Sequence, residues 1–555
     1  MLSVTSFQRA LAHFEHPLHL GSSHGLCASR CAGKVLIAGG VDWDMIGRKP
    51  KAGEVREILP HLETFHLIRE FSDLKIVKAV TGPSAAHSIF ITDEGDVWTL
   101  GRNEKGQLGV GDTAPRPLPV KVPTIYTTAG KKTTNLKFVN AAVGRNHSIL
   151  IAENGAVYGA GDNKMGQLCN DHHKDHTSFV HISSLGREKA TAAACGSDFT
   201  MILSDKGQLW AFGSPEFGEL GNKTNGQYLQ QSNRLVHIPQ TTPVLVGGNL
   251  KDKTIVQVAC GNNHTLALDS EGMVYSWGFG GYGRLGHSKQ EDLWTPMPID
   301  QFAGSNKIMR ATKIACGSSF SMALDGQHQF WLWGKWKNTG DGGGGTPWMY
   351  PRTLYDLNGW SFKDIAGGNV TLFAIPTVEP CTIAWGQGAL HCELGFGEGE
   401  PRSSTKPDKV RPMEGLVMMS ASCGMGHTLL LCQPGQEKLQ DVPKWPVLDV
   451  EEHCIECLSA EDEDSMLLCD KCDSGTHLQC TVPRLQAVPD VDWFCQSCTK
   501  AKERNKTKVS IDAVPSAATP PSSGNKATAK RKAGAAKGTA KKSKTNHNSD
   551  DEDSE

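Results

Sequence analysis

The sequence has little of several features that would place it in a simple class. No apolar stretch approaches the roughly 18 residues that a membrane-spanning helix needs, and the first 20 residues show no basic segment followed by a continuous apolar one. The formal net charge is only −2, and 7 tyrosines stand beside 13 tryptophans. The lack of a membrane helix and of a secretion signal predicts an intracellular protein without a membrane partner. In such a protein the 17 cysteines are not expected to form disulfides.

The motifs of enzyme catalysis are also missing from the sequence. We find no triad of nucleophile, histidine and carboxylate, and no glycine-rich loop of the kind that cradles phosphate. The chain is therefore expected to have no catalytic chemistry of its own. Whether it is an enzyme at all stays open, because a nucleotide exchange factor needs neither a base nor a nucleophile.

What is abundant is glycine, with 60 residues, and much of it falls in a repeat. The segment "AAHSIFITDEGDVWTLGRNEKGQLG" from residue 85 returns in altered form from 145, 197, 262, 318 and 369. The glycine that closes its second apolar strand recurs at intervals of 52 to 65 residues, at Gly101, Gly161, Gly213, Gly278, Gly334 and Gly386. Repeats of this length with short strands and tight turns predict four-stranded blades of a β-propeller.

The ends of the repeat region predict how many blades there are. Residues 34–49 contain the second half of a repeat, and residues 420–435 contain the first half. Together they complete one blade, which gives seven with the six whole repeats. A blade shared between the two ends closes the ring and removes exposed sheet edges. The predicted fold class is therefore all-β, a seven-bladed propeller.

Within the repeats, "GRNEKGQLG", "NKMGQL" and "WGFGGYGRLGH" resemble the regulator-of-chromosome-condensation (RCC) repeat family, most of all its second animal paralogue. The resemblance covers residues 34–435. It implies the seven-bladed fold, a role in chromosome condensation or mitosis, and a small GTPase of the Ran or Rac type as a candidate partner. It assigns no exchange residues.

Some histidines and cysteines occupy equivalent places in successive repeats. Phe199 and Phe320 replace the repeated histidine in two of them, and a metal ligand could not be replaced in this way. We therefore expect packed, hydrogen-bonded histidines and small buried cysteines rather than a metal or catalytic site. The repeated residues are His87, His147, His264 and His427, with Cys195, Cys260, Cys316 and Cys423.

A different cysteine pattern follows the repeats, around "CDKCDSGTHLQC" at 469–480. Eight ligands in pairs, in the order four Cys, one His and three Cys, predict two tetrahedral zinc sites. The order resembles a PHD finger, as does Trp493 two residues before Cys495, whereas the RING finger of ubiquitin ligases has its histidine fourth. The resemblance implies two structural zinc ions with interleaved ligands: Cys454, Cys457, His477 and Cys480 for one, and Cys469, Cys472, Cys495 and Cys498 for the other.

The resemblance also implies a ligand, since PHD fingers read the N-terminal tail of histone H3 as an added strand. An aromatic cage for trimethyl-lysine is not expected, because Gly475 stands where such fingers have tryptophan. The acidic residues instead favour an unmodified cationic peptide. A finger that packs on the propeller or binds another protein is the alternative. The residues assigned to histone binding are Met466, Leu467, Leu468, Asp470, Asp473, Val488, Pro489 and Asp490.

The C-terminal tail is strongly charged and lacks aromatic residues. Residues 500–548 contain 13 Lys or Arg and 2 Asp or Glu, before the acidic end "DDEDSE". This composition predicts disorder and a nuclear localisation signal, with loose binding to nucleosomal DNA as a further expectation. The residues assigned to that signal are Lys530, Arg531, Lys532, Lys541, Lys542 and Lys544.

The organisation that follows is an N-terminal extension (1–33), the propeller (34–435), a linker (436–450), the finger (451–501) and the tail (502–555). We expect a nuclear, chromatin-associated protein whose finger binds the H3 tail while the propeller acts as a protein-interaction scaffold. A guanine-nucleotide exchange factor acting at chromatin is the alternative, and a ubiquitin ligase is disfavoured by the ligand order.

Overall fold

The computed structural model describes residues 32–48, 59–123, 125–126, 132–133, 136–170, 172–230, 234–336, 347–448, 453–460, 465–489 and 491–501. The described residues up to Gln496 belong to one unit, and the described residues from Ser497 onward are grouped in a second. The C-terminal tail, for which the sequence predicts disorder and a nuclear localisation signal, lies outside the described residues. Asp490 lies outside them too. The domain boundaries drawn from the sequence stay a prediction.

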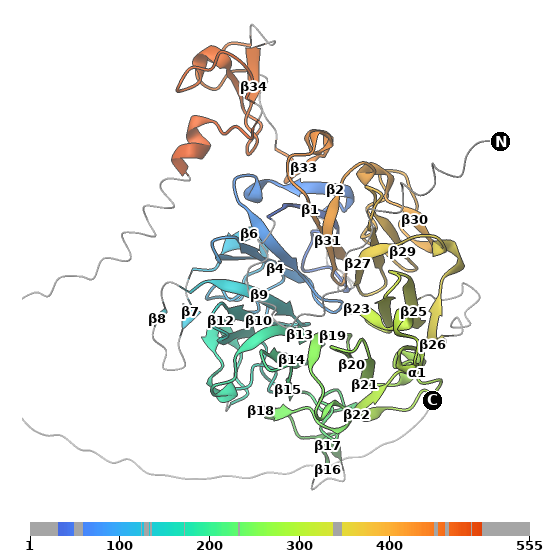
Figure 1. Ribbon diagram of the computed structural model, residues 1–555. Coiled ribbons are helices and arrows are strands. Elements are labelled where there is room, and N and C mark those ends of the chain that lie inside the picture. Colours follow the sequence, from blue (N-terminus) through green and yellow to red (C-terminus); the bar gives the residue numbers. More distant parts are fainter. Residues whose placement is uncertain are drawn as a thin grey trace, which may run out of the picture. The chain divides into compact units, whose positions relative to one another are not determined.

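Among the described residues of the repeat region, seven sheets are arranged as a ring, which confirms the predicted propeller (Figure 1). Six blades come from consecutive chain segments. Blade 1 contains β3 (Ile76–Val80), β4 (His87–Thr92), β5 (Val97–Gly101) and β6 (Arg116–Lys121). Blade 2 contains β9 (Phe138–Val143), β10 (His147–Ala152), β11 (Val157–Gly161) and β12 (His176–His181). Blade 3 contains β13 (Ala190–Cys195), β14 (Phe199–Ser204), β15 (Leu209–Gly213) and β18 (Gln240–Leu245).

The next three blades follow the same order of strands. Blade 4 contains β19 (Ile255–Cys260), β20 (His264–Asp269), β21 (Val274–Gly278) and β22 (Leu293–Pro298). Blade 5 contains β23 (Ala311–Cys316), β24 (Phe320–Asp325), β25 (Phe330–Gly334) and β26 (Trp348–Thr353). Blade 6 contains β27 (Phe362–Gly367), β28 (Leu372–Pro376), β29 (Ile383–Gly386) and β30 (Ser404–Lys409).

The seventh blade is shared between distant parts of the chain, as the sequence predicts. Its strand order is β31-β32-β1-β2-β33, so two strands from the end of the repeats pair with two from the beginning. Lys34 lies opposite Cys432, and Gly39 lies opposite His427. These strands are β31 (Met418–Cys423), β32 (His427–Cys432), β1 (Lys34–Gly39), β2 (Leu62–Ile68) and β33 (Lys444–Trp445).

The fifth strand of this blade comes from the segment assigned to a linker. β33 pairs in parallel with β2, with Ile68 opposite Trp445, and Leu439, Val442 and Trp445 are buried. This part of the segment is therefore anchored on the shared blade.

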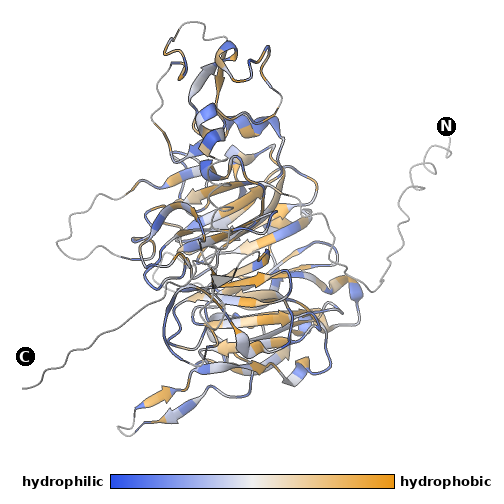
Figure 2. Ribbon diagram, turned by 90° about the vertical axis from the view of Figure 1, so that its left-hand side faces the viewer, coloured by the Kyte–Doolittle hydropathy of each residue, from blue (hydrophilic) through white to orange (hydrophobic). Residues whose placement is uncertain are grey.

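The blades hold together because the second strand of each one is buried on both faces. All six residues of β4 and all six of β10 are buried, and apolar side chains from these two strands share one hydrophobic cluster between blades 1 and 2. Figure 2 shows hydrophobic residues concentrated along the propeller strands. A strand packed against neighbours on both sides has an almost continuous apolar sequence, which is why the segments read "HSIFIT" and "HSILIA".

The repeated histidines join neighbouring blades, as packed residues that also form hydrogen bonds. The ring Nε2 of His147 lies 3.0 Å from the Thr200 hydroxyl of the next blade, and that hydroxyl donates to the Gln167 carbonyl. Because the hydroxyl proton is already used, the imidazole must donate from Nε2. Equivalent contacts join His87 to Ser148, His264 to Ser321 and His427 to Ser88.

Short elements complete the described part of the molecule. Among its residues, no helix has the length and apolar character needed to cross a membrane. The remaining strands are β7 (Ile125–Tyr126), β8 (Lys132–Thr133), β16 (Gln227–Leu229), β17 (Leu235–His237), β34 (Met466–Leu468) and β35 (Gly475–His477). The helices are α1 (Asp300–Ala303), η1 (Arg69–Phe71), η2 (Ser183–Leu185), η3 (Gly248–Leu250), η4 (Gly281–Gly283), η5 (Lys307–Met309), η6 (Tyr355–Leu357), η7 (Arg411–Met413), η8 (Glu437–Asp441) and η10 (Leu478–Cys480).

Candidate zinc centres and peptide-binding edge

The structure gathers the eight predicted zinc ligands into two groups of four, in the interleaved arrangement expected of the finger. Within each group the ligand atoms lie within 4.8 Å of one another. The groups are Cys454, Cys457, His477 and Cys480, and Cys469, Cys472, Cys495 and Cys498. Interleaved ligands tie the two ends of this short segment to its middle, so the finger depends on both sites for its fold.

The distances within the groups fit tetrahedral zinc. With Zn–S bonds of about 2.3 Å, the sulfur atoms of a tetrahedral site lie about 3.8 Å apart, and the Cys472 and Cys495 Sγ atoms are 3.7 Å apart. His477 Nδ1 lies 3.3 Å from Cys457 Sγ and 3.9 Å from Cys480 Sγ, so this nitrogen faces the site. The finger therefore holds two structural zinc ions, and each four-ligand site is closed to a reactive water.

Two matching turns bring the ligands into place. The Leu458 N–H donates to the Cys454 carbonyl at 2.8 Å, and the Asp473 N–H donates to the Cys469 carbonyl at 2.8 Å. Leu458 and Asp473 both have a positive φ, 59° and 54°. The residue after each Cys-x-x-Cys pair thus adopts the left-handed conformation that reverses the chain, which aspartate tolerates better than leucine.

Between the zinc sites, β34 and β35 form a hairpin whose hydrogen bonding leaves one edge of β34 accessible. Cys469 N–H donates to the Ser474 carbonyl at 3.1 Å, and Leu468 lies opposite Gly475. Antiparallel residue pairs alternate between bonded and non-bonded, so Leu468 and Met466 are in non-bonded positions. Accordingly, the Gly475 carbonyl accepts from the Ile455 N–H at 2.9 Å instead.

The backbone N–H and C=O groups of Met466 and Leu468 therefore point away from β35. The two-stranded sheet has no further strand on that side among the residues described. Leu467 is buried, whereas the Leu468 side chain is 59% exposed. This edge can accept an extended peptide as a third strand.

The other residues assigned to histone binding lie in different surroundings. One oxygen of Asp470 accepts from the Trp493 N–H at 2.7 Å, and Asp473 is ion-paired with Arg69 and Lys444. Val488 is exposed and Pro489 is partly buried. Sequence reasoning missed Arg69 and Lys444, and no sequence signal connects them with a finger residue so far along the chain.

The position that holds tryptophan in trimethyl-lysine cages is filled differently here. A Cβ atom placed on Gly475 would lie 2.6 Å from the Met466 Sδ and 3.1 Å from its Cγ. The flexible Met466 side chain therefore covers the space that a larger side chain at 475 would need.

The repeated cysteines of the propeller are buried and chemically quiet. Burial raises the pKa of Cys195 to about 12 and the pKa of Cys423 to about 12. Burial also raises the pKa of Cys260 and Cys316. These thiols stay protonated at neutral pH, which makes them poor nucleophiles.

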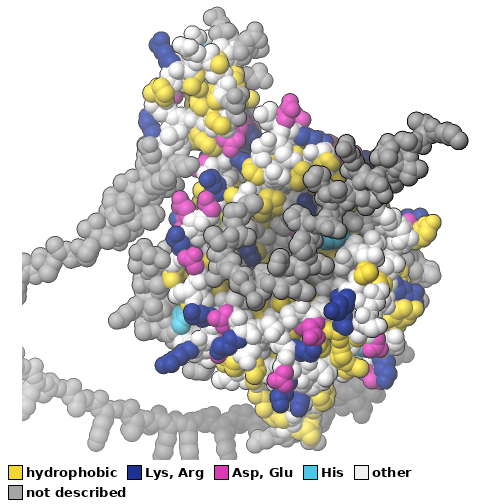
Figure 3. All heavy atoms as spheres, viewed as in Figure 1, with side chains coloured by type: hydrophobic (Ala, Val, Ile, Leu, Met, Phe, Trp, Pro, Cys, Tyr) yellow, Lys and Arg dark blue, Asp and Glu magenta, His cyan; other side chains and the backbone are white. Residues whose placement is uncertain are grey.

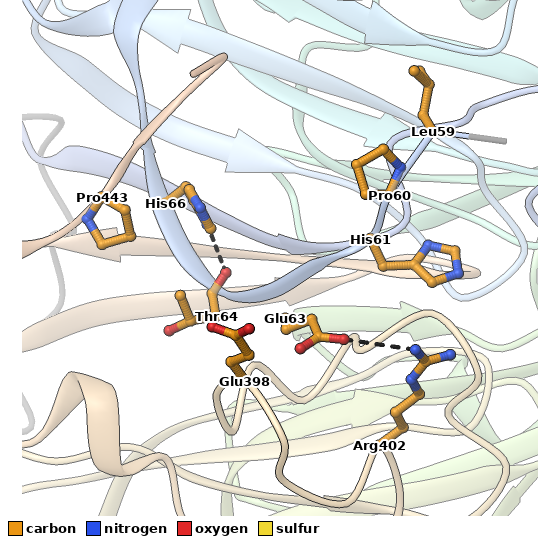
Figure 4. Close-up of a pocket in the computed structure, with 9 residues that line it drawn as sticks. All are labelled: Leu59, Pro60, His61, Glu63, Thr64, His66, Glu398, Arg402 and Pro443. Carbon is orange, nitrogen blue, oxygen red and sulfur yellow. Dashed lines mark hydrogen bonds and ion pairs between the residues drawn. The ribbon is translucent and has the colours of Figure 1, made fainter. Parts of the chain in front are cut away.

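A pocket of about 750 Å³ lies beside β2 and the loop that precedes β30 (Figure 4). Its polar groups form a mixed set, with Glu63 3.6 Å from Arg402 and His66 Nδ1 2.8 Å from the Thr64 carbonyl. No local sequence signal marks this pocket, because its two walls are more than 300 residues apart in the chain. Its lining residues are Leu59, Pro60, His61, Glu63, Thr64, His66, Glu398, Arg402 and Pro443.

The β16–β17 hairpin of blade 3 carries apolar side chains on the surface of the propeller. Tyr228, Leu229 and Leu235 are 44%, 67% and 50% exposed. In Figure 3, hydrophobic side chains gather over this hairpin at the lower rim. Contiguous exposed apolar side chains of this kind mark protein interaction surfaces.

Comparisons with known proteins agree with the geometry. Residues 94–151, 154–203, 206–268 and 271–324 match the regulator of chromosome condensation (RCC1) repeat, and residues 454–498 match the PHD-finger. The zebrafish Danio rerio protein named RCC2 homolog is 36% identical over 431 residues, which cover 74% of this chain and 84% of that protein. Human RCC2 is 34% identical over 448 residues, covering 77% of this chain and 82% of that protein.

Solved structures show the same fold. The yeast RCC1 protein Prp20, described in complex with Kap60, superposes with a TM-score of 0.57 at 18% sequence identity, covering 77% of this chain and 98% of that one. Human WBSCR16 superposes equally well, with a TM-score of 0.57 over 72% of this chain and 99% of that one, also at 18% identity. The chain belongs to the RCC1-repeat family, is related to RCC2, and carries a PHD finger after its propeller.

Proposed function

We propose that the finger binds the N-terminal tail of histone H3, unmodified at lysine 4, and that it does so in the nucleus on chromatin. The observation that supports this best is the accessible edge of β34. Met466 and Leu468 offer two sets of outward backbone groups, spaced as a β-strand partner requires. Buried Leu467 between them fixes which face of the strand packs inward.

The preference for an unmodified lysine follows from the surroundings of this edge. A methyl-ammonium group is bound by aromatic faces, and Met466 covers Gly475, the place where such fingers have tryptophan. Carboxylates instead favour a cation whose N–H donors are free. Asp470 and Asp473 supply these carboxylates at the end of the hairpin, where they are assigned to an unmodified arginine near the start of the tail. Val488, Pro489 and Asp490 are assigned to the free amino terminus of the tail.

Around this reader, the propeller serves as a scaffold for protein partners. Support comes from a protein with the same fold: Prp20p of Saccharomyces cerevisiae has been studied for its binding to Gsp1p and histones. The basic C-terminal tail, with 13 Lys or Arg between residues 500 and 548, would add nuclear import and salt-sensitive contacts with nucleosomal DNA.

The test is a titration of the zinc-loaded full chain with fluorescent H3 tail peptides that are unmodified or trimethylated at lysine 4. The unmodified peptide should bind more tightly. Leu468→Pro should weaken binding, because it removes an outward N–H but no hydrogen bond to β35. Leu468→Val, which keeps the N–H, is the matched control. Stronger binding of the trimethylated peptide would overturn the proposal.

A second candidate function is guanine-nucleotide exchange on a Ran or Rac-type GTPase, and the apolar β16–β17 hairpin favours it. An exchange factor must bind its GTPase through its surface, and exposed apolar side chains such as those of this hairpin mark protein interaction surfaces. Release of fluorescent GDP should then accelerate with the full chain and fall when Leu229 and Leu235 are replaced by serine. No release from a panel of GTPases would leave the scaffold function alone.

A further inference from the structure

The residues that connect the finger with the propeller are charged, and the pairs are close. The Arg69 guanidinium lies 2.5 Å from Asp473 Oδ2, and Lys444 Nζ lies 2.8 Å from Asp473 Oδ1. Lys471 Nζ lies 2.9 Å from Asp73 Oδ1. Lys471 lies between the zinc ligands Cys469 and Cys472, and Asp473 lies between Cys472 and the strand β35. One loop of the finger therefore makes all three contacts.

These contacts differ from ordinary surface ion pairs, because two of the charged side chains are shielded from water. The side chains of Arg69 and Asp73 are each only 8% exposed. Arg69 also donates from Nε to the Pro446 carbonyl at 2.5 Å, which fixes the orientation of its guanidinium. Shielded and oriented charges interact more strongly than exposed ones, and removing one partner leaves the other uncompensated.

The positions of these cations bear on the peptide site. A peptide arginine is held best when both oxygens of a carboxylate are available to its two parallel N–H groups. Both oxygens of Asp473 already face cations of the propeller, Arg69 on one and Lys444 on the other. The structure therefore records Asp473 in an occupied state.

From this occupancy we propose that Arg69, supported by Lys444, is an internal stand-in for the arginine of the bound peptide. The inference rests on the proposed function of the finger. In the closed state the propeller holds Asp473, and the peptide site is incomplete. In the open state Asp473 turns to the peptide arginine beside Asp470. The propeller thus competes with the histone tail for one carboxylate and lowers the affinity of the finger.

The contact with Asp473 is made by the shared blade. Arg69 begins η1, directly after β2, and Lys444 lies in β33, which pairs with β2. The two cations therefore come from the blade that closes the ring. A partner that disturbs this blade would release Asp473, which connects the scaffold with the reader.

The test compares the full chain with its Arg69→Gln and Lys444→Gln variants, all zinc-loaded, in titrations with the unmodified H3 tail peptide. When a binding-competent state is only partly populated, the apparent Kd rises in proportion. We expect Arg69→Gln to tighten binding roughly threefold to tenfold and Lys444→Gln to tighten it less. Arg145→Gln, which breaks the Asp198 ion pair elsewhere on the propeller, is the matched control and should change nothing.

A second peptide separates competition from a general loosening of the finger. When the peptide arginine is replaced by alanine, the wild type and the Arg69→Gln variant should bind equally weakly, since the competed group is absent. Lys444→Gln covers the case in which Arg69→Gln fails to fold, because Lys444 is more exposed. Equal affinity of all variants for the unmodified peptide would overturn the stand-in while the proposed function holds. No binding by any variant would overturn the proposed function and the stand-in with it.

Discussion

The buried histidines that recur in the repeats predict that the propeller loses stability in acid. His147 allows a direct test. Burial lowers the pKa of His147 from 6.5 to about 4. Its Nε2 donates to Thr200, and its Nδ1 is buried with no hydrogen-bond partner among the described residues. A proton added at Nδ1 would therefore be desolvated and unpaired, so the folded protein resists protonation there.

The sign and size follow from linkage. Because the folded pKa lies below the unfolded value, the unfolded chain binds more protons between pH 6.5 and 4, and stability falls as the pH falls through that window. At pH 5 this difference costs about 2 kcal/mol for His147. Burial lowers the pKa of His87 and of His427 to about 3, which adds about 2 kcal/mol for each at the same pH.

The perturbation is His147→Phe, a change that the fold already contains at Phe199 and Phe320. At pH 8 the variant should be less stable by about 1 kcal/mol, the net value of one hydrogen bond. At pH 5 it should be more stable than the wild type by about 1 kcal/mol, because it no longer carries the protonation cost. The order of the two proteins therefore reverses with pH.

Urea unfolding followed by tryptophan fluorescence at pH 8 and pH 5 measures both free energies. Thr200→Val is the matched control. It removes the hydrogen bond with His147, together with the one that the Thr200 hydroxyl donates to Gln167, but it keeps the titrating imidazole. This variant should therefore be destabilised at both pH values without a reversal. A free-energy difference between wild type and His147→Phe that stays the same at both pH values would refute the reasoning.

Two further predictions concern the finger and the shared blade. Removing zinc with a strong chelator should unfold the finger and abolish peptide binding while the propeller keeps its β-sheet circular dichroism, since zinc supplies most of the folding free energy of such a segment; metal analysis should give two zinc ions per chain, and a single ion would contradict the two-site geometry. Trp445→Ala should cost about 3 kcal/mol in urea unfolding, because it removes a buried side chain that holds β33 against β2. An unchanged unfolding midpoint for that variant would mean that β33 does not stabilise the blade.

Much of the fold could be predicted because its signals are local and repeated. Each blade declares itself by the same buried strand, turn and closing glycine, and two half-repeats at the ends were enough to predict the shared seventh blade. The zinc ligands were equally accessible, since the order and spacing of cysteine and histidine reflect the geometry of two tetrahedral sites. Gly475, together with the absence of aromatic residues from 455–466, argued against a methyl-lysine cage.

Other features were decided only in three dimensions. The sequence assigned residues 436–450 to a linker, and the structure pairs part of them with β2, because a parallel partner almost 380 residues away leaves no local trace. The pocket that Glu63 and Arg402 line could not be predicted for the same reason, because its two walls are far apart in the chain. The sequence predicts that Asp473 is a peptide-binding carboxylate, but nothing in its surrounding sequence indicates that Arg69 and Lys444 pair with it.

The sequence by itself therefore determined the repeating strands, the closed ring and the chemistry of the two zinc sites. Each of these depends on residues close in the chain or on a pattern that recurs. Only the tertiary structure decided which charges meet, since a single ion pair between distant segments follows no period. That distinction matters most at Asp473, where the sequence predicts a contact with a peptide and the structure shows ion pairs with Arg69 and Lys444.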